Sequence, residues 1–165
     1  MTPEHKALAC ELVAREAQLL DQQRWTEWLD LYREDAVFWV PTWKSDGTLS
    51  SDPDTELSLI YMDGRALLHE RVQRLTSGRS VAAMPVPRTT HLVGGTLVDA
   101  IDADAALVQS AWMTHIYLHK QPESLAYAGR YEHLLRWQDG QWRIARKKVV
   151  LTNDQLRSKL DFFYV

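Results

Sequence analysis

The side chains of this chain that could bind a metal ion through nitrogen or sulfur in the usual way are six histidines and a single cysteine, Cys10. An iron–sulfur centre held by two cysteines and two histidines is therefore excluded, because one cysteine cannot supply both thiolates. A mononuclear iron site needs only two histidines and a carboxylate, so composition alone leaves that chemistry open. The histidines are His5, His69, His91, His115, His119 and His133.

His115 and His119 form the histidine pair with the most metal-like spacing. If they lie in a strand, they share a face but are about 13 Å apart, because a strand advances about 3.3 Å per residue. Two ligands of one ion cannot lie so far apart without a bulge, so we expect surface or interface histidines. His91 and His133 could meet across strands, where hydrogen-bonded core histidines are favoured over metal ligands.

General acid–base catalysis is the remaining chemistry that the chain could perform by itself. No GxSxG turn and no glycine-rich phosphate loop occurs in the sequence. In a closed pocket, an aspartate and a tyrosine could act on a bound ketone. The candidate pocket residues are Asp30, Asp35, Tyr61, Asp63 and His91, and Tyr32 is a further tyrosine that could take part. A structural interpretation is favoured for them: helix-end and helix-capping acids, and core aromatic side chains.

Helices are predicted to open the chain. Over residues 4–23, leucines recur at Leu8, Leu12 and Leu19, which is the spacing of an amphipathic helix with one buried stripe. A second, short helix is expected over residues 25–32, and the charged residues 33–35 are expected to end it. Both helices can pack on whatever follows.

The next segment alternates between strand and helix character. Residues 36–40 are branched or aromatic and precede Pro41, so a short strand is expected there. A polar loop over 42–56 leads to a second strand over 57–62. A helix over 64–75 should follow, with Asp63 as its cap and Gly78 as its stop.

The second half of the chain shows four long strand candidates, at residues 88–101, 107–120, 126–137 and 142–151. Asp102 and Asp139-Gly140 are turn signals between them, so an antiparallel meander is the simplest connection. Alternation places two sets of side chains each on one face. They are Val108, Ser110, Trp112, Thr114, Ile116 and Leu118, and Gly129, Tyr131, His133, Leu135 and Trp137.

Helices followed by a long curved sheet predict an α+β fold in which the helices cover one sheet face. The order resembles the cone-shaped fold shared by nuclear transport factor 2 and ketosteroid isomerase. That fold hosts both enzymes and structural subunits, so it leaves function undecided. We expect a single domain over 1–165, with a helical part at 1–35, strands, loop and helix at 36–87, the antiparallel sheet at 88–152 and a tail at 153–165.

Composition narrows the class of protein further. The 165 residues carry a net charge of -3, with basic residues scattered among acids, so nucleic acid is not an expected partner. The basic cluster at 143–148 is expected to be solvated or to face a protein. No apolar run long enough for a membrane and no secretory signal is found, so we expect a cytoplasmic protein. Seven tryptophans indicate a large aromatic core or a protein–protein interface. Trp39, Trp43 and Trp112 are the three whose surroundings would distinguish these two roles.

Several motifs along the chain resemble those of the small (beta) subunits of aromatic-ring-hydroxylating dioxygenases. The densest matches are Trp25 with Trp28-Leu29, Phe38-Trp39-Val40-Pro41 with Trp43, Asp52-Pro53, residues 57–63, Glu70-Arg71-Val72, Pro87-Arg88-Thr89 with His91, Lys148-Val149-Val150-Leu151 with Asn153-Asp154, and residues 160–165. Within that family, the Trp43 loop, the Asp52-Pro53 step and the last residues look most like the benzoate, toluate and anthranilate branch.

The resemblance implies a structural subunit with no catalytic residue, cofactor or metal of its own. It implies assembly with a large (alpha) subunit as an α3β3 hexamer, and self-association as a trimer. The large subunit would carry a Rieske [2Fe-2S] cluster and mononuclear Fe(II), and a separate reductase would deliver electrons from NADH. The reaction implied is insertion of both atoms of O2 into an aromatic acid, with benzoate as the expected substrate, to give a cis-dihydrodiol carboxylate.

Within this interpretation Glu70, Arg71 and Arg88 are candidates for buried or interfacial charge pairs, because arginine presents a planar donor fork to carboxylates. A charge pair within one subunit is an equally good interpretation. Two rival hypotheses remain open: a free-standing pocket enzyme of the isomerase or dehydratase type, and a small-ligand binding protein on the same fold.

Overall fold

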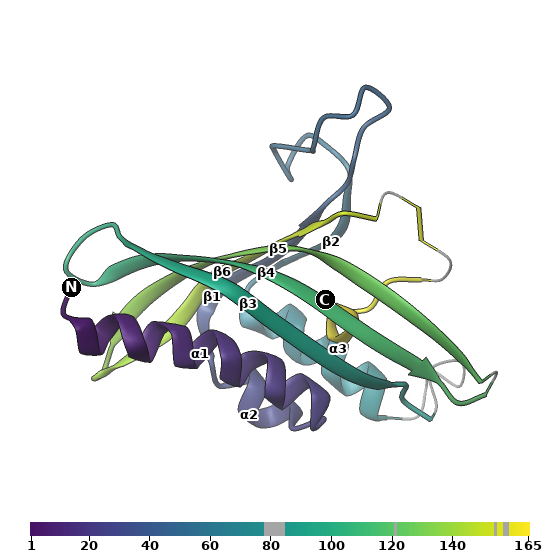
Figure 1. The fold of residues 1–165 in the computed structure, drawn as a ribbon, viewed down its shortest axis with the longest axis horizontal. Helices are drawn as coiled ribbons and strands as arrows, with labels where there is room; N and C mark the ends of the chain where they lie inside the picture. The colour runs from purple at the N-terminus through teal and green to yellow at the C-terminus, as the bar shows by residue number, and fades with distance from the viewer. Residues whose placement is uncertain (78–84, 121, 154, 157–158) are drawn as a thin grey trace.

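Three α-helices lie on one face of a six-stranded sheet in the computed structural model, which describes residues 1–77, 85–120, 122–153, 155–156 and 159–165 (Figure 1). This arrangement confirms the α+β prediction. The helices are α1 (Pro3–Asp21), α2 (Trp25–Leu29) and α3 (Arg65–Thr76), and a 3-10 turn, η2 (Phe162–Tyr164), lies near the end of the chain. The strands are β1 (Tyr32–Pro41), β2 (Ser58–Asp63), β3 (Arg88–Ala100), β4 (Ala105–Leu118), β5 (Glu123–Gln138) and β6 (Gln141–Leu151).

The strands are ordered β2-β1-β6-β5-β4-β3. The last four strands in sequence form the predicted antiparallel meander, and β1 joins β6 in parallel while pairing with β2 in the antiparallel sense. β2 and β3 are therefore the two edges of the sheet. Among the described residues no helix is both long and apolar enough to cross a bilayer.

Helix α1 begins as its sequence predicts. Pro3 occupies the first turn, and the backbone N–H of His5 donates to the Thr2 hydroxyl at 3.2 Å. The buried stripe of the helix runs through Leu12, Glu16 and Leu20, so one acidic residue lies among the apolar ones. The helix packs along β3, and its last residue, Asp21, reaches that strand.

Two local predictions were wrong. Helix α2 ends at Leu29, and the residues from Tyr32 to Asp35 belong to β1, where Tyr32 pairs with Ile144 of β6. Asp63 does not cap α3: the capping position is Gly64, whose φ of 92° turns the chain into the helix without a side-chain hydrogen bond. The predicted stop at Gly78 lies outside the described residues.

The core lies between the helices and the inner face of the sheet. On β4 the predicted alternation is confirmed: Val108, Ser110, Trp112, Thr114 and Ile116 are buried, whereas the residues that alternate with them between 109 and 115 are exposed. Trp112 stacks on Tyr131 of β5 with ring centroids 5.0 Å apart. The η2 turn lies on the same side of the sheet as the helices (Figure 1) and places Phe162 against Trp28 at 5.0 Å.

A bulge in β6 changes which of its basic residues face inward. On β5 the neighbours Leu134 and Leu135 pair with Arg146 and Ile144, so Ala145 is an extra residue on β6. Strict alternation from Ile144 would turn Arg146 towards the core. The bulge exposes Arg146 and buries Lys147 completely. The basic cluster at 143–148 is thus not solvated throughout.

Candidate functional site

A buried ionic network lies between the helices and the sheet, around Glu16 of α1. Both carboxylate oxygens accept from the Lys147 ammonium group at 2.9 Å, and both side chains are 0% exposed. The same carboxylate accepts from the indole N–H of Trp28 at 2.9 Å and the hydroxyl of Tyr32 at 2.7 Å. Lys147 also donates to the backbone oxygen of Val165 at 3.3 Å. We call these five residues the Glu16 network. It ties α1, α2, β1 and β6 to the end of the chain.

The opposite charges of Glu16 and Lys147 neutralise each other within the Glu16 network. Burial alone would raise the pKa of Glu16, but the Lys147 ammonium beside it holds that pKa far below its usual range. Burial lowers the pKa of Lys147, and Glu16 opposes that change. The Lys147 ammonium also lies 4.3 Å from the centroid of the Tyr131 ring. An acid and a base already neutralised by each other are not available to move a substrate proton, so this network is structural.

His133 of β5 lies beside the network without a hydrogen bond to it. Its Nε2 atom is 3.6 Å from Glu16 Oε2, which is beyond hydrogen-bond distance, and neither ring nitrogen has a partner. Burial lowers the pKa of His133, so the neutral ring is favoured. His133 is therefore a core histidine.

A second, partly buried polar contact joins the end of α1 to β3. One Asp21 oxygen accepts from His91 Nδ1 at 2.6 Å and from the Thr89 hydroxyl at 2.8 Å, and the other accepts from the His91 backbone N–H at 2.8 Å. Burial would raise the pKa of Asp21, but its hydrogen bonds with His91 lower it below the usual value. The ring nitrogen of His91 that faces away from Asp21 is buried and has no partner.

The five candidate pocket residues do not meet at one place. Asp30, Asp35 and Asp63 are exposed and lie at the end of α2, on β1 and at the end of β2. Tyr61 is partly exposed on the edge strand β2, and His91 alone is buried on the inner face of the sheet. Asp30 borders an open surface hollow whose lining also includes Arg65 and His69. Among the described residues, this set does not form an acid and tyrosine facing one closed pocket.

The three candidate charge-pair residues lie at the surface. Glu70 and Arg71 are on α3, where Glu70 is exposed and Arg71 half-buried, and Arg88 is exposed at the start of β3. Within the part of the chain that the structure describes, no ion pair within the subunit involves any of them. Burial raises the pKa of Asp161 above its usual value, and the nearby charge of Arg71 opposes that rise without cancelling it. Their role at an interface stays a prediction.

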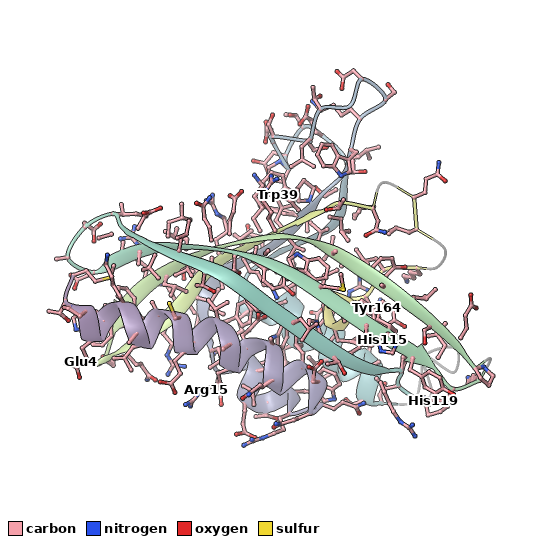
Figure 2. All side chains as sticks on the ribbon, viewed as in Figure 1. Glu4, Arg15, Trp39, His115, His119 and Tyr164 are labelled. Atoms are coloured by element: carbon pink, nitrogen blue, oxygen red, sulfur yellow. The ribbon has the colours of Figure 1, made fainter. Side chains whose placement is uncertain are left out.

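No group of three or more histidine, cysteine, aspartate or glutamate side chains is placed to hold a metal ion among the described residues. His115 is exposed on β4, and His119 lies in the turn that follows. Figure 2 shows both towards the end of the sheet opposite Glu4. His119 is next to the ring of Tyr117, with centroids 6.3 Å apart.

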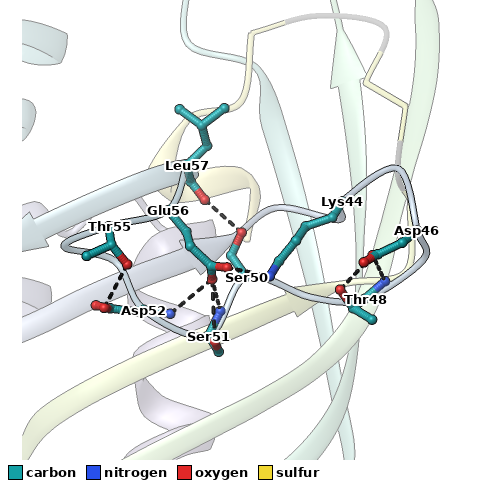
Figure 3. A network of polar contacts seen from close by, with 9 residues as sticks. All are labelled: Lys44, Asp46, Thr48, Ser50, Ser51, Asp52, Thr55, Glu56 and Leu57. Atoms are coloured by element: carbon teal, nitrogen blue, oxygen red, sulfur yellow. Dashed lines mark hydrogen bonds and ion pairs between the residues drawn. The ribbon is translucent and has the colours of Figure 1, made fainter.

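An ordered polar loop over residues 42–57 projects beyond the sheet between β1 and β2 (Figure 1). Lys44 and Glu56 form an ion pair across the loop, and Asp46 accepts from the Thr48 hydroxyl at 2.6 Å (Figure 3). The bond from Lys44 and the backbone N–H groups of residues 51 and 52 lower the pKa of Glu56 to about 2. These contacts give the loop a defined shape without a hydrophobic core of its own.

The three tryptophans of interest have different surroundings. Trp112 is in the core, and Trp39, labelled in Figure 2, is 6% exposed with its indole N–H donating to Ser58 at 2.9 Å. Trp43 begins the projecting loop and donates to the backbone oxygen of Leu151 at 2.7 Å. Trp43 thus anchors the loop to β6.

Exposed apolar side chains gather at two places. The β2 patch consists of Leu57, Leu59 and Tyr61, and Leu57 is 82% exposed. The β3 patch consists of Leu92 and Met113, which are directly opposite each other on β3 and β4 and are 65% and 46% exposed. Exposed apolar groups at sheet edges are typical of surfaces that another chain covers.

Sequence reasoning missed the Glu16 network because Glu16 and Lys147 are 131 positions apart. One part of it was visible: Glu16 falls four residues after Leu12 and four before Leu20, within the apolar stripe of α1. The bulge that turns Lys147 inward has no comparable pattern in the sequence.

Residues 15–158 of the chain match the family model described as ring hydroxylating beta subunit. The chain is 38% identical over 155 residues to the 2-halobenzoate 1,2-dioxygenase small subunit of Burkholderia cepacia, covering 93% of this chain and 92% of that protein. Its structure is similar to that of the benzoate 1,2-dioxygenase beta subunit of Burkholderia mallei, with a TM-score of 0.77, 33% identity and 95% of each chain covered.

The fold alone is shared more widely. An NTF2-like protein with a cystatin-like fold from Novosphingobium aromaticivorans has a TM-score of 0.61 and 19% identity, covering 92% of this chain and 84% of that one. The predicted resemblance to the fold of nuclear transport factor 2 is confirmed.

Proposed function

The chain belongs to the ring hydroxylating beta subunit family, and we propose that it is the non-catalytic small subunit of an aromatic-ring dioxygenase. Its role would be to support assembly of the complete enzyme. The observation that carries the proposal is the match to that family over residues 15–158. The 2-halobenzoate and benzoate relatives favour an aromatic acid as the substrate of the complete enzyme, and benzoate is our choice.

The interior chemistry supports a structural role. Glu16 and Lys147 neutralise each other at 2.9 Å, and Asp21 is committed to His91 and Thr89. Asp30, Asp35 and Asp63 are spread over three elements at the surface. A base poised for catalysis needs a free lone pair beside a substrate, and none of these five carboxylates has that position.

The reaction would take place on a large (alpha) subunit. That subunit would hold a Rieske [2Fe-2S] cluster and mononuclear Fe(II), which would supply the redox chemistry, and a separate reductase would deliver the two electrons from NADH. Benzoate, O2, NADH and a proton would give the cis-dihydrodiol carboxylate and NAD+. This chain cannot hold the cluster, because its one cysteine supplies one of the two thiolates required. We place the assembly in the cytoplasm as an α3β3 hexamer built on a trimer of this chain.

The β2 patch, the β3 patch and the projecting loop are the surfaces that such an assembly would cover. The two patches lie at opposite edges of the sheet, so one chain can contact two different neighbours. The loop already has a defined shape, which reduces the ordering cost of binding. Glu70, Arg71 and Arg88 are our candidates for polar contacts around these surfaces.

Co-expression with a benzoate-type large subunit tests the proposal. The complex would be purified through a tag on this chain and supplied with reductase, NADH and benzoate, while O2 uptake and the cis-dihydrodiol product are measured. We expect coupled turnover by the complex and none by the isolated chain. Turnover by the isolated chain, or failure of the two subunits to copurify, would overturn the proposal.

A further inference from the structure

Three polar side chains form a row on the inner face of the sheet, across three neighbouring strands. His91 of β3 is directly opposite Thr114 of β4, and Thr114 is directly opposite Tyr127 of β5. Directly opposite residues of antiparallel strands have Cβ atoms about 5 Å apart, so the three side chains are adjacent. All three residues are at least nine-tenths buried.

Each member of this row has a polar atom that is buried and unpartnered. The atoms are the Nε2 of His91, the hydroxyl of Thr114 and the hydroxyl of Tyr127. The indole N–H of Trp112, two residues along β4 on the same face, is a fourth. Buried polar groups in native proteins are almost always hydrogen-bonded, so four neighbouring exceptions point to a bound species that satisfies them.

The Asp21 carboxylate determines which ring nitrogen of His91 carries the proton, and thereby how the row can form hydrogen bonds. A carboxylate can only accept, so the 2.6 Å contact makes His91 Nδ1 the donor. In the neutral ring the Nε2 atom is then an acceptor. The row therefore offers one fixed acceptor, two hydroxyls that can donate or accept, and the indole N–H donor. A ligand hydroxyl fits this set, since it donates to His91 and accepts from the others.

The surroundings of the row favour a neutral, aromatic ligand. Ile116 and Leu125 form the next pair along the strands, and the Tyr164 ring lies 6.4 Å from that of Tyr127. The buried Lys147 ammonium is already bound by both oxygens of Glu16 and does not compensate an anion here. Asp21, behind His91, would repel an anionic ligand.

We propose that His91, Thr114 and Tyr127 form an internal binding site for a small neutral phenol-class compound. The hydroxyl of the ligand would donate to His91 Nε2 and accept from Tyr127 or Thr114, and its ring would lie against the apolar side chains of Ile116 and Leu125. This inference does not depend on the role of the chain in a dioxygenase.

Calorimetric titration of the purified full chain with phenol tests the site. We expect saturable binding of one phenol per chain, weakened about tenfold by Tyr127→Phe and by Thr114→Val, since each removes one hydrogen bond. Neither variant loses a protein hydrogen bond, so both should keep the circular dichroism spectrum of the parent. Tyr61→Phe and Thr90→Val make the same changes at exposed positions and should leave the affinity unchanged.

Benzoate at neutral pH is the anionic comparison, and it should bind at least about tenfold more weakly than phenol. Three results would each overturn the proposal. They are absence of saturable phenol binding, which would leave ordered water as the occupant; equal phenol affinity in parent, Tyr127→Phe and Thr114→Val; and benzoate binding as tight as that of phenol. Because the readout is binding to the chain alone, it is separate from any test of assembly with a large subunit.

Discussion

At the scale of single residues, the Glu16 network is the place where a substitution should reduce the stability of this protein most. Glu16 and Lys147 are 0% exposed and hold each other at 2.9 Å. A buried ion pair contributes little net stability, because desolvation offsets the attraction, but loss of one partner leaves an uncompensated charge. Neither residue could be recognised as a partner from sequence, because their contact depends on packing of α1 against β6.

The variant Glu16→Gln is expected to lower the free energy of unfolding by about 3–5 kcal/mol, because the Lys147 ammonium would stay buried without its counter-charge. Urea denaturation followed by tryptophan fluorescence measures the change. The matched control is Glu11→Gln on the same helix, where the ion pair with Arg15 has both side chains more than half exposed. The control should cost less than about 1 kcal/mol, and equal losses in the two variants would contradict the assignment.

Acid is expected to destabilise the fold in two stages. Burial lowers the pKa of His133 below its ordinary 6.5. Below pH 6.5 the His133 ring therefore binds a proton more readily in the unfolded chain than in the folded one, and the stability of the fold decreases. Burial would raise the pKa of Glu16, but Lys147 holds it well below 4.5. The stability contributed by the ionised carboxylate is therefore complete above pH 4.5 and is lost as the pH falls below it.

Denaturation curves recorded from about pH 7 to about pH 3 measure this dependence, and both stages should have the same sign. The Glu16→Gln variant should lose much of the fall below pH 4.5 and keep the fall below pH 6.5. A parent protein whose stability is constant or rises on acidification through this range would show that the two buried groups titrate as in the unfolded chain.

At the scale of elements, the long strands could be predicted because their side chains alternate in burial over many residues, as on β4 between Val108 and Ile116. Shorter elements were less certain. The segment from Tyr32 to Asp35 has helix-like spacing with Trp28, and only pairing of Tyr32 with Ile144, 112 residues away along β6, places it in a strand. Non-local pairing of this kind has no local sequence pattern. The bulge at Ala145 is a further example, because it changes which face Lys147 occupies.

The packing of β5 on β6 depends on Gly129. A Cβ atom at this position would lie 1.9 Å from the backbone oxygen of Val150, and a backbone atom cannot move aside as a flexible side chain can. Gly129→Ala is therefore expected to lower the free energy of unfolding by about 1–3 kcal/mol, which chemical denaturation would measure.

Gly94→Ala is the matched control for Gly129→Ala. Gly94 also lies in a strand, but a Cβ atom there would meet nothing within 4 Å. Its effect should stay within about 0.5 kcal/mol. If the two alanine variants were equally stable, β5 and β6 would not be as close at Gly129 as the structure places them.

At the scale of the whole molecule, the fold and the family could be predicted from sequence, but the exposed apolar patches could not. Motifs such as Phe38-Trp39-Val40-Pro41 identify the family, whereas Leu57 and Leu92 look like ordinary strand residues. Their exposure of 82% and 65% appears only once the sheet is formed and its edges are known. A partner that covers them, as we propose, would belong to a complex, and the sequence of a single chain does not describe that complex.

Charged substitutions in the two patches should weaken assembly without unfolding the chain. Leu57→Asp and Leu92→Asp are each expected to raise a dissociation constant of the complex by about tenfold or more, because a carboxylate would be buried in an apolar contact. Size-exclusion chromatography of the co-expressed subunits measures this, with thermal unfolding of the isolated chain as the check on folding. Ile101→Asp, at a 56% exposed position beyond the end of β3, is the control. Full assembly of both patch variants would show that the partners bind elsewhere.

The most direct test of the assembly role is the native mass of the complex formed when this chain and a benzoate-type large subunit are expressed together. Native mass spectrometry gives the number of each subunit without assuming a shape. We expect one species with three copies of this chain and three large subunits, and we expect all of the iron to be lost when the large subunits are removed. A chain that stays free of the large subunit, or that retains stoichiometric iron by itself, would contradict it.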